Sequence, residues 1–360
     1  MADSIFLKKR RGRALWLFLP IILFLYLVLF PRPLGREMYL RTIWAKSVSP
    51  ASTVLSDSNS PRWSFRASDT FGYADLDGNL YYVGQRLHNL SLLDSGFINY
   101  GSVPDHIVFM NTRGEFQFSI KSYGYPLLDS GGEFLYSINT DLSGLKRIDR
   151  EGKILWSLSF PVPLTTAALA GEECVIGLMD GRLLLIGSDG EVIYEQETGG
   201  SRIPVILGTA ITEDRQQIAL FSGIDPQSLS IVRRLDNEFV TEVALDLDSD
   251  FRKEVDLSFS PDARFLYFEV EEGLGVLDIR KKITAEILSP GVLWSLDVAS
   301  DFSAAAFRTQ RGSNLLIFRP LRSVLLSRQL AVPDVFLRII DNSLILGIDG
   351  FLLRADLTEG

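Results

Sequence analysis

The sequence predicts an all-β fold: a seven-bladed β-propeller of four-stranded antiparallel blades, preceded by one N-terminal transmembrane helix. Three observations lead to this prediction. A long apolar run follows a basic cluster at the N-terminus, long helical periodicity is absent beyond residue 63, and a unit of strand, polar turn and strand recurs seven times. With 360 residues, 46% of them hydrophobic, the chain can bury a large core.

The first 30 residues have the pattern of a membrane anchor. Residues 1–13 form a basic segment with five Lys and Arg side chains, and residues 14–30 carry no charge. A helix of that length spans roughly 26 Å, near the lower limit for a hydrocarbon core. No small-x-small site follows directly, so we expect an uncleaved signal anchor, with a cleaved signal sequence as the alternative. The basic residues predict a cytoplasmic N-terminus and an exported remainder, which in a bacterium means an inner-membrane protein with a periplasmic domain.

Residues 31–62 are expected to join this helix to the folded domain. Residues 34–44 mix apolar and basic side chains and fit a short juxtamembrane helix, whereas residues 47–60 contain six serines. The serine-rich stretch cannot bury a core and is expected to be a flexible linker. The propeller domain is therefore predicted over residues 63–360.

The repeated unit predicts the blades. Its strand, turn and strand occupy residues 73–83, 126–136, 166–176, 205–220, 257–268, 296–307 and 337–346. The steps between successive turns are 54, 40, 42, 48, 39 and 41 residues, close to the period of propeller blades. The long first step indicates about ten extra residues between Gly84 and Gly124, and the fourth unit has an insertion between Ser222 and Lys253.

Closure of the ring can also be predicted. The last unit has room for only three strands before the chain ends at Gly360, so a fourth strand must come from elsewhere. Residues 62–66 precede the first unit and are expected to supply it. Such pairing of the two ends would remove an exposed sheet edge.

Two local patterns carry a resemblance to known families. Residues 145–156 and 181–194 contain hairpins with a Gly-containing turn, and this pattern resembles the quinoprotein-like (PQQ-like) repeat, in which a strand, Asp-x-x-Gly and an aromatic residue recur. The unit at Ser260-Pro261-Asp262 resembles the blades of WD40-like and TolB-like propellers. In architecture the chain is similar to the BamB-like and TolB-like adaptors of envelope assembly, which implies an exported propeller that binds other proteins.

Few residues are candidates for chemistry, because the chain has one Cys and two His. His88 and His106 have no recognisable partner, Cys174 lies in an apolar strand, and Asp246, Asp248 and Asp250 lack the Gly and Glu that a calcium loop needs. We therefore assign no catalytic, cofactor-binding or metal-ligating residue and expect no cofactor. Beyond residue 13 the chain has 31 basic and 44 acidic residues, which argues against nucleic-acid binding.

These observations favour a non-catalytic function. We expect a membrane-anchored extracytoplasmic propeller that acts as a protein-binding or scaffolding module in a cell-envelope complex, with protein partners in the envelope. The alternative is a propeller enzyme or small-ligand binder, of the quinoprotein-like or glycan-processing kind. A quinoprotein dehydrogenase commonly has a vicinal Cys pair, which a chain with one Cys cannot supply.

Overall fold

The structure, a computed structural model, describes residues 38–50, 62–102, 105–121, 124–236, 238–321 and 323–359. The predicted basic segment (1–13), anchor helix (14–30) and most of the serine-rich linker lie outside these residues. No helix in the described ranges is long and apolar enough to cross a bilayer. The chain divides into a large unit, residues 40–357, and a small unit of residues 1–39 and 358–360. In the small unit, the Thr358 hydroxyl donates to the Tyr39 carbonyl oxygen at 3.2 Å.

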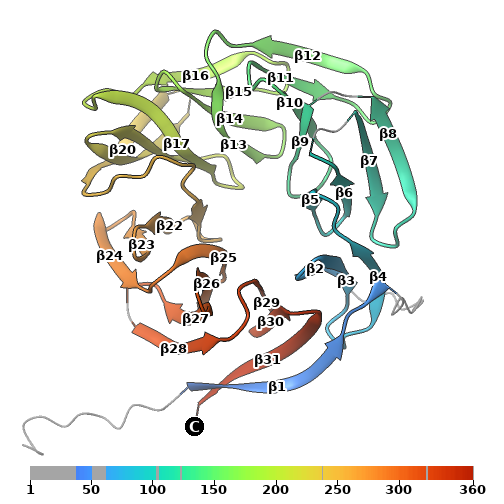
Figure 1. Ribbon diagram of the computed structural model, residues 1–360. Helices are drawn as coiled ribbons and strands as arrows, with labels where there is room; N and C mark the ends of the chain where they lie inside the picture. The colour runs from blue at the N-terminus through green and yellow to red at the C-terminus, as the bar shows by residue number, and fades with distance from the viewer. Residues whose placement is uncertain are drawn as a thin grey trace, which may run out of the picture. The chain divides into compact units, whose positions relative to one another are not determined.

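The large unit is a β-propeller whose described residues form eight antiparallel blades around a central axis (Figure 1). Blade 1 contains β2 (Trp63–Ala67), β3 (Thr70–Ala74) and β4 (Leu80–Gln85). Blade 2 contains β5 (Asn89–Leu92), β6 (Gly96–Tyr100), β7 (His106–Asn111) and β8 (Phe116–Lys121). Blade 3 contains β9 (Gly124–Leu128), β10 (Leu135–Asn139), β11 (Gly144–Ile148) and β12 (Ile154–Ser159). Blade 4 contains β13 (Leu164–Ala170), β14 (Glu173–Leu178), β15 (Arg182–Ile186) and β16 (Val192–Glu197).

The second half of the ring has the same plan. Blade 5 contains β17 (Ile203–Ile211), β18 (Gln217–Ile224), β19 (Gln227–Leu235) and β20 (Glu238–Leu247). Blade 6 contains β21 (Leu257–Phe259), β22 (Phe265–Val270), β23 (Gly273–Asp278) and β24 (Ile283–Leu288). Blade 7 contains β25 (Val292–Val298), β26 (Ser303–Thr309), β27 (Gly312–Arg319) and β28 (Ser323–Leu330). Blade 8 contains β29 (Val335–Ile340), β30 (Ser343–Ile348), β31 (Phe351–Glu359) and the N-terminal strand β1 (Met38–Ser47).

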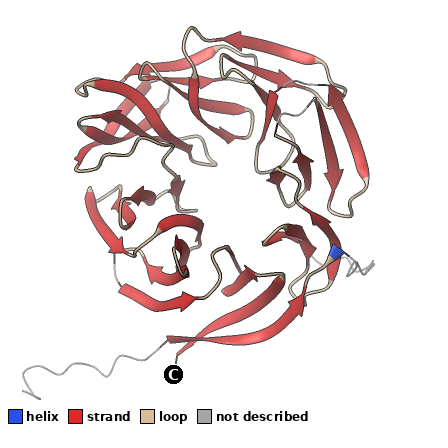
Figure 2. Cartoon of the chain, in the orientation of Figure 1, coloured by secondary structure: helices blue, strands red, loops and turns tan. Residues whose placement is uncertain are grey.

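The prediction of seven blades is therefore wrong: there are eight in the described chain, and blade 1 has three strands (Figure 2). The hairpin at residues 73–83 is the last hairpin of blade 1, between β3 and β4, and not the first hairpin of a longer unit. About ten extra residues were expected between Gly84 and Gly124, but this stretch contains the whole of blade 2. The insertion expected in the fourth unit is mostly additional strand, because β18, β19 and β20 are 8, 9 and 10 residues long.

A regular contact joins the first blades of the ring. Four turn glycines, at positions 78, 114, 152 and 190, have a positive φ of 73–87°. A large side chain from the outer strand of the preceding blade lies against each of them. A Cβ on Gly114 would lie 2.3 Å from the Tyr82 ring, so both backbone and space require glycine there. The glycines are 36, 38 and 38 residues apart. The pairs are Trp44 with Gly78, Tyr82 with Gly114, Ile120 with Gly152, and Trp156 with Gly190.

Strand β1 closes the ring, in place of the expected residues 62–66, which lie at and just before β2 of blade 1. It lies beside β31 as the outer strand of blade 8, and residues 38–44 are strand where a juxtamembrane helix was expected. The Trp44 indole donates to the Leu76 carbonyl oxygen at 3.0 Å, and the Val48 amide to that of Gly350 at 2.7 Å. The two ends of the propeller are thereby held in one sheet.

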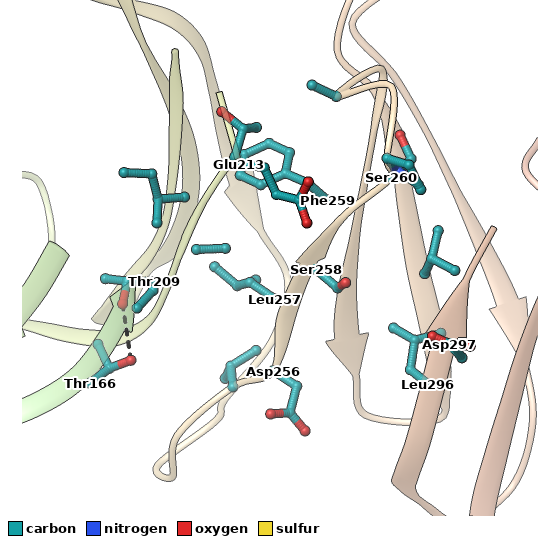
Figure 3. Close-up of a pocket in the computed structure, with 18 of the residues that line it drawn as sticks. Thr166, Thr209, Glu213, Asp256, Leu257, Ser258, Phe259, Ser260, Leu296 and Asp297 are labelled. Atoms are coloured by element: carbon teal, nitrogen blue, oxygen red, sulfur yellow. Dashed lines mark hydrogen bonds between the residues drawn. The ribbon is translucent and has the colours of Figure 1, made fainter. Parts of the chain in front are cut away.

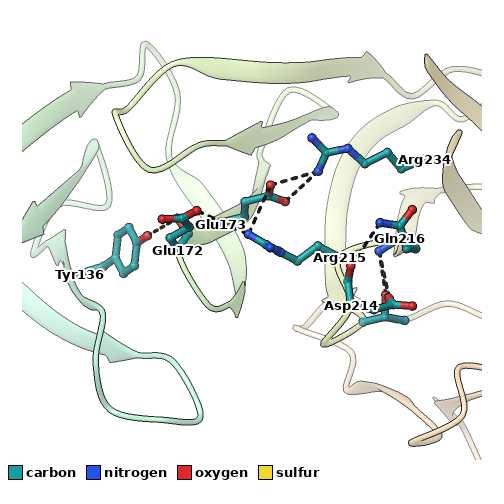
Figure 4. A network of polar contacts seen from close by, with 8 residues as sticks. Tyr136, Glu172, Glu173, Asp214, Arg215, Gln216 and Arg234 are labelled. Carbon is teal, nitrogen blue, oxygen red and sulfur yellow. Dashed lines mark hydrogen bonds and ion pairs between the residues drawn. The ribbon is translucent and has the colours of Figure 1, made fainter. Parts of the chain in front are cut away.

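The core lies mainly between neighbouring blades. One buried cluster joins Val175 and Leu183 of blade 4 to Ile206 and Ile218 of blade 5. Polar contacts also cross these interfaces, as Figure 4 shows: the buried carboxylate of Glu173 accepts two bonds from Arg234, at 3.0 and 3.2 Å. These inter-blade contacts fix the positions of the innermost strands that line the centre of the ring.

Candidate functional site: the central channel

The main candidate site is a cavity of about 950 Å³ in the centre of the ring (Figure 3). Its wall comes from the innermost strands of four consecutive blades, β13, β17, β21 and β25, and from the residues that flank them. A volume of this size matches the upper end of the range for small-molecule sites and also accommodates a peptide segment. Its position at the ring centre means that each blade contributes only a few residues.

Two matching turns form part of the rim. In blade 5 the Thr212 hydroxyl donates to Asp214 at 2.6 Å, and in blade 6 the Ser260 hydroxyl donates to Asp262 at 2.6 Å. The Ser260 oxygen also accepts the backbone N–H of Phe265 at 2.9 Å. Such local side-chain bonds stabilise tight turns, so these two aspartates are engaged in holding the backbone.

Four other carboxylates line the cavity without any ion pair among the described residues: Glu213, Glu254, Asp256 and Asp297. Burial and the neighbouring Asp256 charge raise the pKa of Glu254, against a hydrogen bond with Thr166. Burial likewise raises the pKa of Asp297, although its carboxylate accepts the Ile339 N–H. No lysine or arginine of the described chain lines this cavity, so its wall has a negative potential.

A second cavity of about 530 Å³ shares Asp256, Leu257, Ser258 and Leu296 with the first. The two cavities are therefore continuous along β21. Blades 1, 7 and 8 complete the second wall, which is the part of the channel that contains cationic side chains.

The cationic side chains in the second cavity are Arg66 and Arg86 of blade 1. Two aromatic residues, Trp294 and Phe336, also line it, and Trp294 is 44% exposed. The Arg308 guanidinium lies 3.5 Å from the centroid of the Trp294 ring and forms an ion pair with Asp334. The channel thus has an acidic region and a region with two arginines.

The residues considered from the sequence lie elsewhere. His88 is exposed between β4 and β5, and His106 is exposed at the start of β7, 3.5 Å from Asp105. Cys174 is fully buried in β14, and burial raises the pKa of its thiol. None of the three lines either channel cavity.

The three aspartates near the end of β20 do not converge either. The Asp250 carboxylate pairs with Arg252 at 3.2 Å, while the intervening Ser249 hydroxyl donates to Gln227 at 2.7 Å. Within the described ranges, no group of three or more His, Cys, Asp or Glu side chains could hold a metal ion.

Sequence reasoning missed the channel carboxylates. A usable signal was present, since Glu213, Asp256 and Asp297 each lie at or next to the first strand of a repeated unit. First strands are innermost in propeller blades, so acidic residues recurring there predict a negatively charged channel.

Comparison with known proteins agrees with the fold. A protein of Treponema pallidum (strain Nichols), described as uncharacterized, is 23% identical over 315 residues, which cover 82% of each chain. The crystal structure of BamB from Moraxella catarrhalis superposes with a TM-score of 0.60 at 12% identity, covering 88% of this chain and all of that one. The computationally designed Ika8 protein has a TM-score of 0.60 at 15% identity, covering 90% of this chain and all of that one.

A β-propeller family also matches nearly the whole sequence. The matching family is described as beta-propeller protein, and the match covers residues 6–360. Together with the eight blades of the structure, this match assigns the chain to that family: it is a member of a family of β-propeller proteins.

Proposed function

We propose that this propeller is a non-catalytic binding module, anchored in the bacterial inner membrane and exposed to the periplasm, that binds a protein partner of the cell envelope. The observation that carries the proposal is the acidic wall of the channel. Four carboxylates, from blades 5 and 7 and from the segment that leads into blade 6, form no ion pair with any described residue, and two of them have raised pKa values. Uncompensated charge of one sign favours a ligand of the opposite sign. A basic segment of a partner protein has that charge and fits the channel volume.

The anchor rests on the N-terminal sequence. Five basic residues precede an uncharged stretch at residues 14–30, and this order favours a cytoplasmic N-terminus. Blade 8 begins its closing strand at Met38, a few residues beyond that stretch. In the sequence, only a short segment would therefore separate the anchor from the propeller.

Partner binding is tested on the full chain solubilised from its own membranes. Recovery of the co-purifying protein is compared between the wild type and a triple variant, Glu213→Gln, Glu254→Gln and Asp256→Asn. We expect the variant to bind at least tenfold more weakly, which corresponds to about 1.4 kcal/mol. Unchanged recovery would contradict the proposal.

A matched control removes the same number of charges from the outer surface. Glu191, Glu197 and Glu286 are exposed, and they lie in or next to the outer strands of blades 4 and 6. Their triple Gln variant is expected to recover the partner as the wild type does. An equal loss in both variants would indicate only a general effect of net charge.

Topology is tested by labelling with a membrane-impermeant maleimide. Ser327 is exposed on outer strand β28, and the single native thiol, Cys174, is fully buried and gives little background. The Ser327→Cys chain is expected to react in spheroplasts with an intact inner membrane. Reaction only after the inner membrane is permeabilised would contradict the periplasmic location.

One observation favours a second candidate, a glycan-processing enzyme. Glu254 and Asp297 line the same cavity, and carboxyl groups with raised pKa values can act as general acids. A screen of cell-wall glycans separates the candidates. Turnover that is lost in both Glu254→Gln and Asp297→Asn would support the enzyme and contradict the non-catalytic function.

A further inference from the structure

Arg66 and Arg86 are two neighbouring arginines that have no carboxylate partner in the described part of the chain. Both are half-buried and both line the second channel cavity. The Arg66 guanidinium donates one bond, to the Leu90 carbonyl oxygen at 3.3 Å, and neither side chain forms an ion pair with any described residue. Burial and the nearby Arg86 charge lower the pKa of Arg66. Two guanidinium groups at close quarters repel one another unless an anion lies between them.

We infer that Arg66 and Arg86 form a binding site for a carboxylate group inside the channel, and that its occupant is the C-terminal carboxylate of a basic peptide segment. This inference rests on the proposed function, because it names the part of the partner that enters the ring. Each guanidinium offers five N–H donors in a fixed fork that matches a carboxylate. The Leu90 bond uses one donor of Arg66 and leaves the others available.

The rest of the channel selects the kind of anion. Asp256 lines the same cavity as the two arginines and also lines the acidic cavity. It would repel a phosphate with two negative charges more strongly than a carboxylate with one. Beyond it, Glu213, Glu254 and Asp297 favour cationic side chains. A chain terminus with lysine or arginine in its last residues satisfies both regions at once.

Geometry also favours a chain terminus over an internal carboxylate. Both arginines come from blade 1, Arg66 in β2 and Arg86 directly after β4. The facing wall is formed by the starts of β21, β25 and β29, with Trp294 and Phe336 among the lining side chains. The aromatic surface can cover the apolar part of the last residue while the arginines bind its carboxylate.

The test measures binding of two labelled octapeptides to the full chain in detergent by fluorescence anisotropy. Both peptides contain three lysines; one ends in a free carboxylate and the other in an amide. We expect amidation to weaken binding at least tenfold in the wild type. The Arg86 side chain forms no hydrogen bond with any residue that the structure describes, so Arg86→Gln should weaken binding of the free-acid peptide tenfold and leave binding of the amide peptide unchanged.

Arg113 provides the matched control, because it is exposed in the turn between β7 and β8 and outside both cavities. Arg113→Gln should bind both peptides as the wild type does. Equal weakening of both peptides by Arg86→Gln, or no effect of amidation, would overturn the carboxylate site. Inorganic phosphate that displaces the free-acid peptide better than acetate does, at equal ionic strength, would assign the site to phosphate and also overturn it.

The outcomes separate this inference from the proposed function. Undiminished recovery of the cellular partner by Arg86→Gln would leave the proposed function standing and remove this site. If the peptides bind as expected but no partner is recovered from membranes, the carboxylate site would stand and the proposed function would be contradicted.

Discussion

The docking of Trp156 between blades 3 and 4 can be tested quantitatively. Its indole lies against the turn glycine Gly190, its Nε1 donates to the Ser188 carbonyl oxygen at 2.9 Å, and its ring meets Tyr136 edge-on at 5.8 Å. Trp156→Ala removes all three contacts. The hydrogen bond contributes about 1 kcal/mol and the aromatic pair about another, and the lost apolar contact of a half-buried ring brings the total to about 3 kcal/mol.

Thermal unfolding of the full chain measures this loss. With an unfolding entropy of about 2.1 cal/mol/K per residue, a propeller of this size loses about 1.5 °C per kcal/mol, so we expect Tm to fall by about 4–5 °C. Trp294→Ala is the matched control, since Trp294 is 44% exposed at the channel wall and the Arg308 guanidinium stacks on its ring. Its Tm should fall by about 1 °C. Equal shifts in the two variants would refute a stabilising role for the inter-blade contact.

Three further predictions concern Trp44, Asp94 and Glu254. Trp44→Ala breaks the bond to Leu76 and loosens ring closure, so calorimetry should show a loss of about 2–3 kcal/mol in one transition that involves all blades. Burial raises the pKa of Asp94, but the hydrogen bonds from Arg338 and the positive charge of Arg338 lower it further, so the pKa in the folded protein lies below its usual value. The ionised Asp94 therefore stabilises the fold above the pKa of the unfolded chain, and this stability is lost as pH falls through the pKa of the folded protein. Asp94→Asn should therefore lower the urea midpoint at pH 7, with a difference that disappears in acid. Burial raises the pKa of Glu254, so its ionised form lowers stability as pH rises above its unfolded pKa, and Glu254→Gln should melt slightly higher than the wild type at pH 7.

Most of the architecture was predictable from the sequence, and the errors have physical causes. A four-stranded blade contains three successive hairpins, and each has the pattern of strand, turn and strand. Spacing alone therefore did not show that Gly78 belongs to the outer hairpin of blade 1. The spacing of the glycines at 78, 114, 152 and 190 marks the blades better than the strand and turn pattern does, because each of these glycines lies against a side chain from the preceding blade. Strand β1 was missed because its apolar and basic residues follow a predicted membrane helix and resemble a juxtamembrane segment.

The channel was harder to predict than the blades. Three of its carboxylates, Glu213, Glu254 and Asp297, are separated from one another by more than 40 residues in the sequence. A single sequence does not show which side of an innermost strand faces the axis when neighbouring residues are also polar. The arginine pair needed the structure for the same reason, since Arg66 and Arg86 meet only through the fold of blade 1.

Site-specific photo-crosslinking in living cells shows whether a partner protein enters the channel. A photoreactive residue at Ser258, which lines both channel cavities, is compared with one at Ser327 on outer strand β28. A binding channel predicts a crosslinked partner protein from position 258, lost in the Glu213→Gln, Glu254→Gln and Asp256→Asn variant, and none from position 327. Crosslinks from position 327 alone would contradict the account and place the partner on the outer surface of the ring.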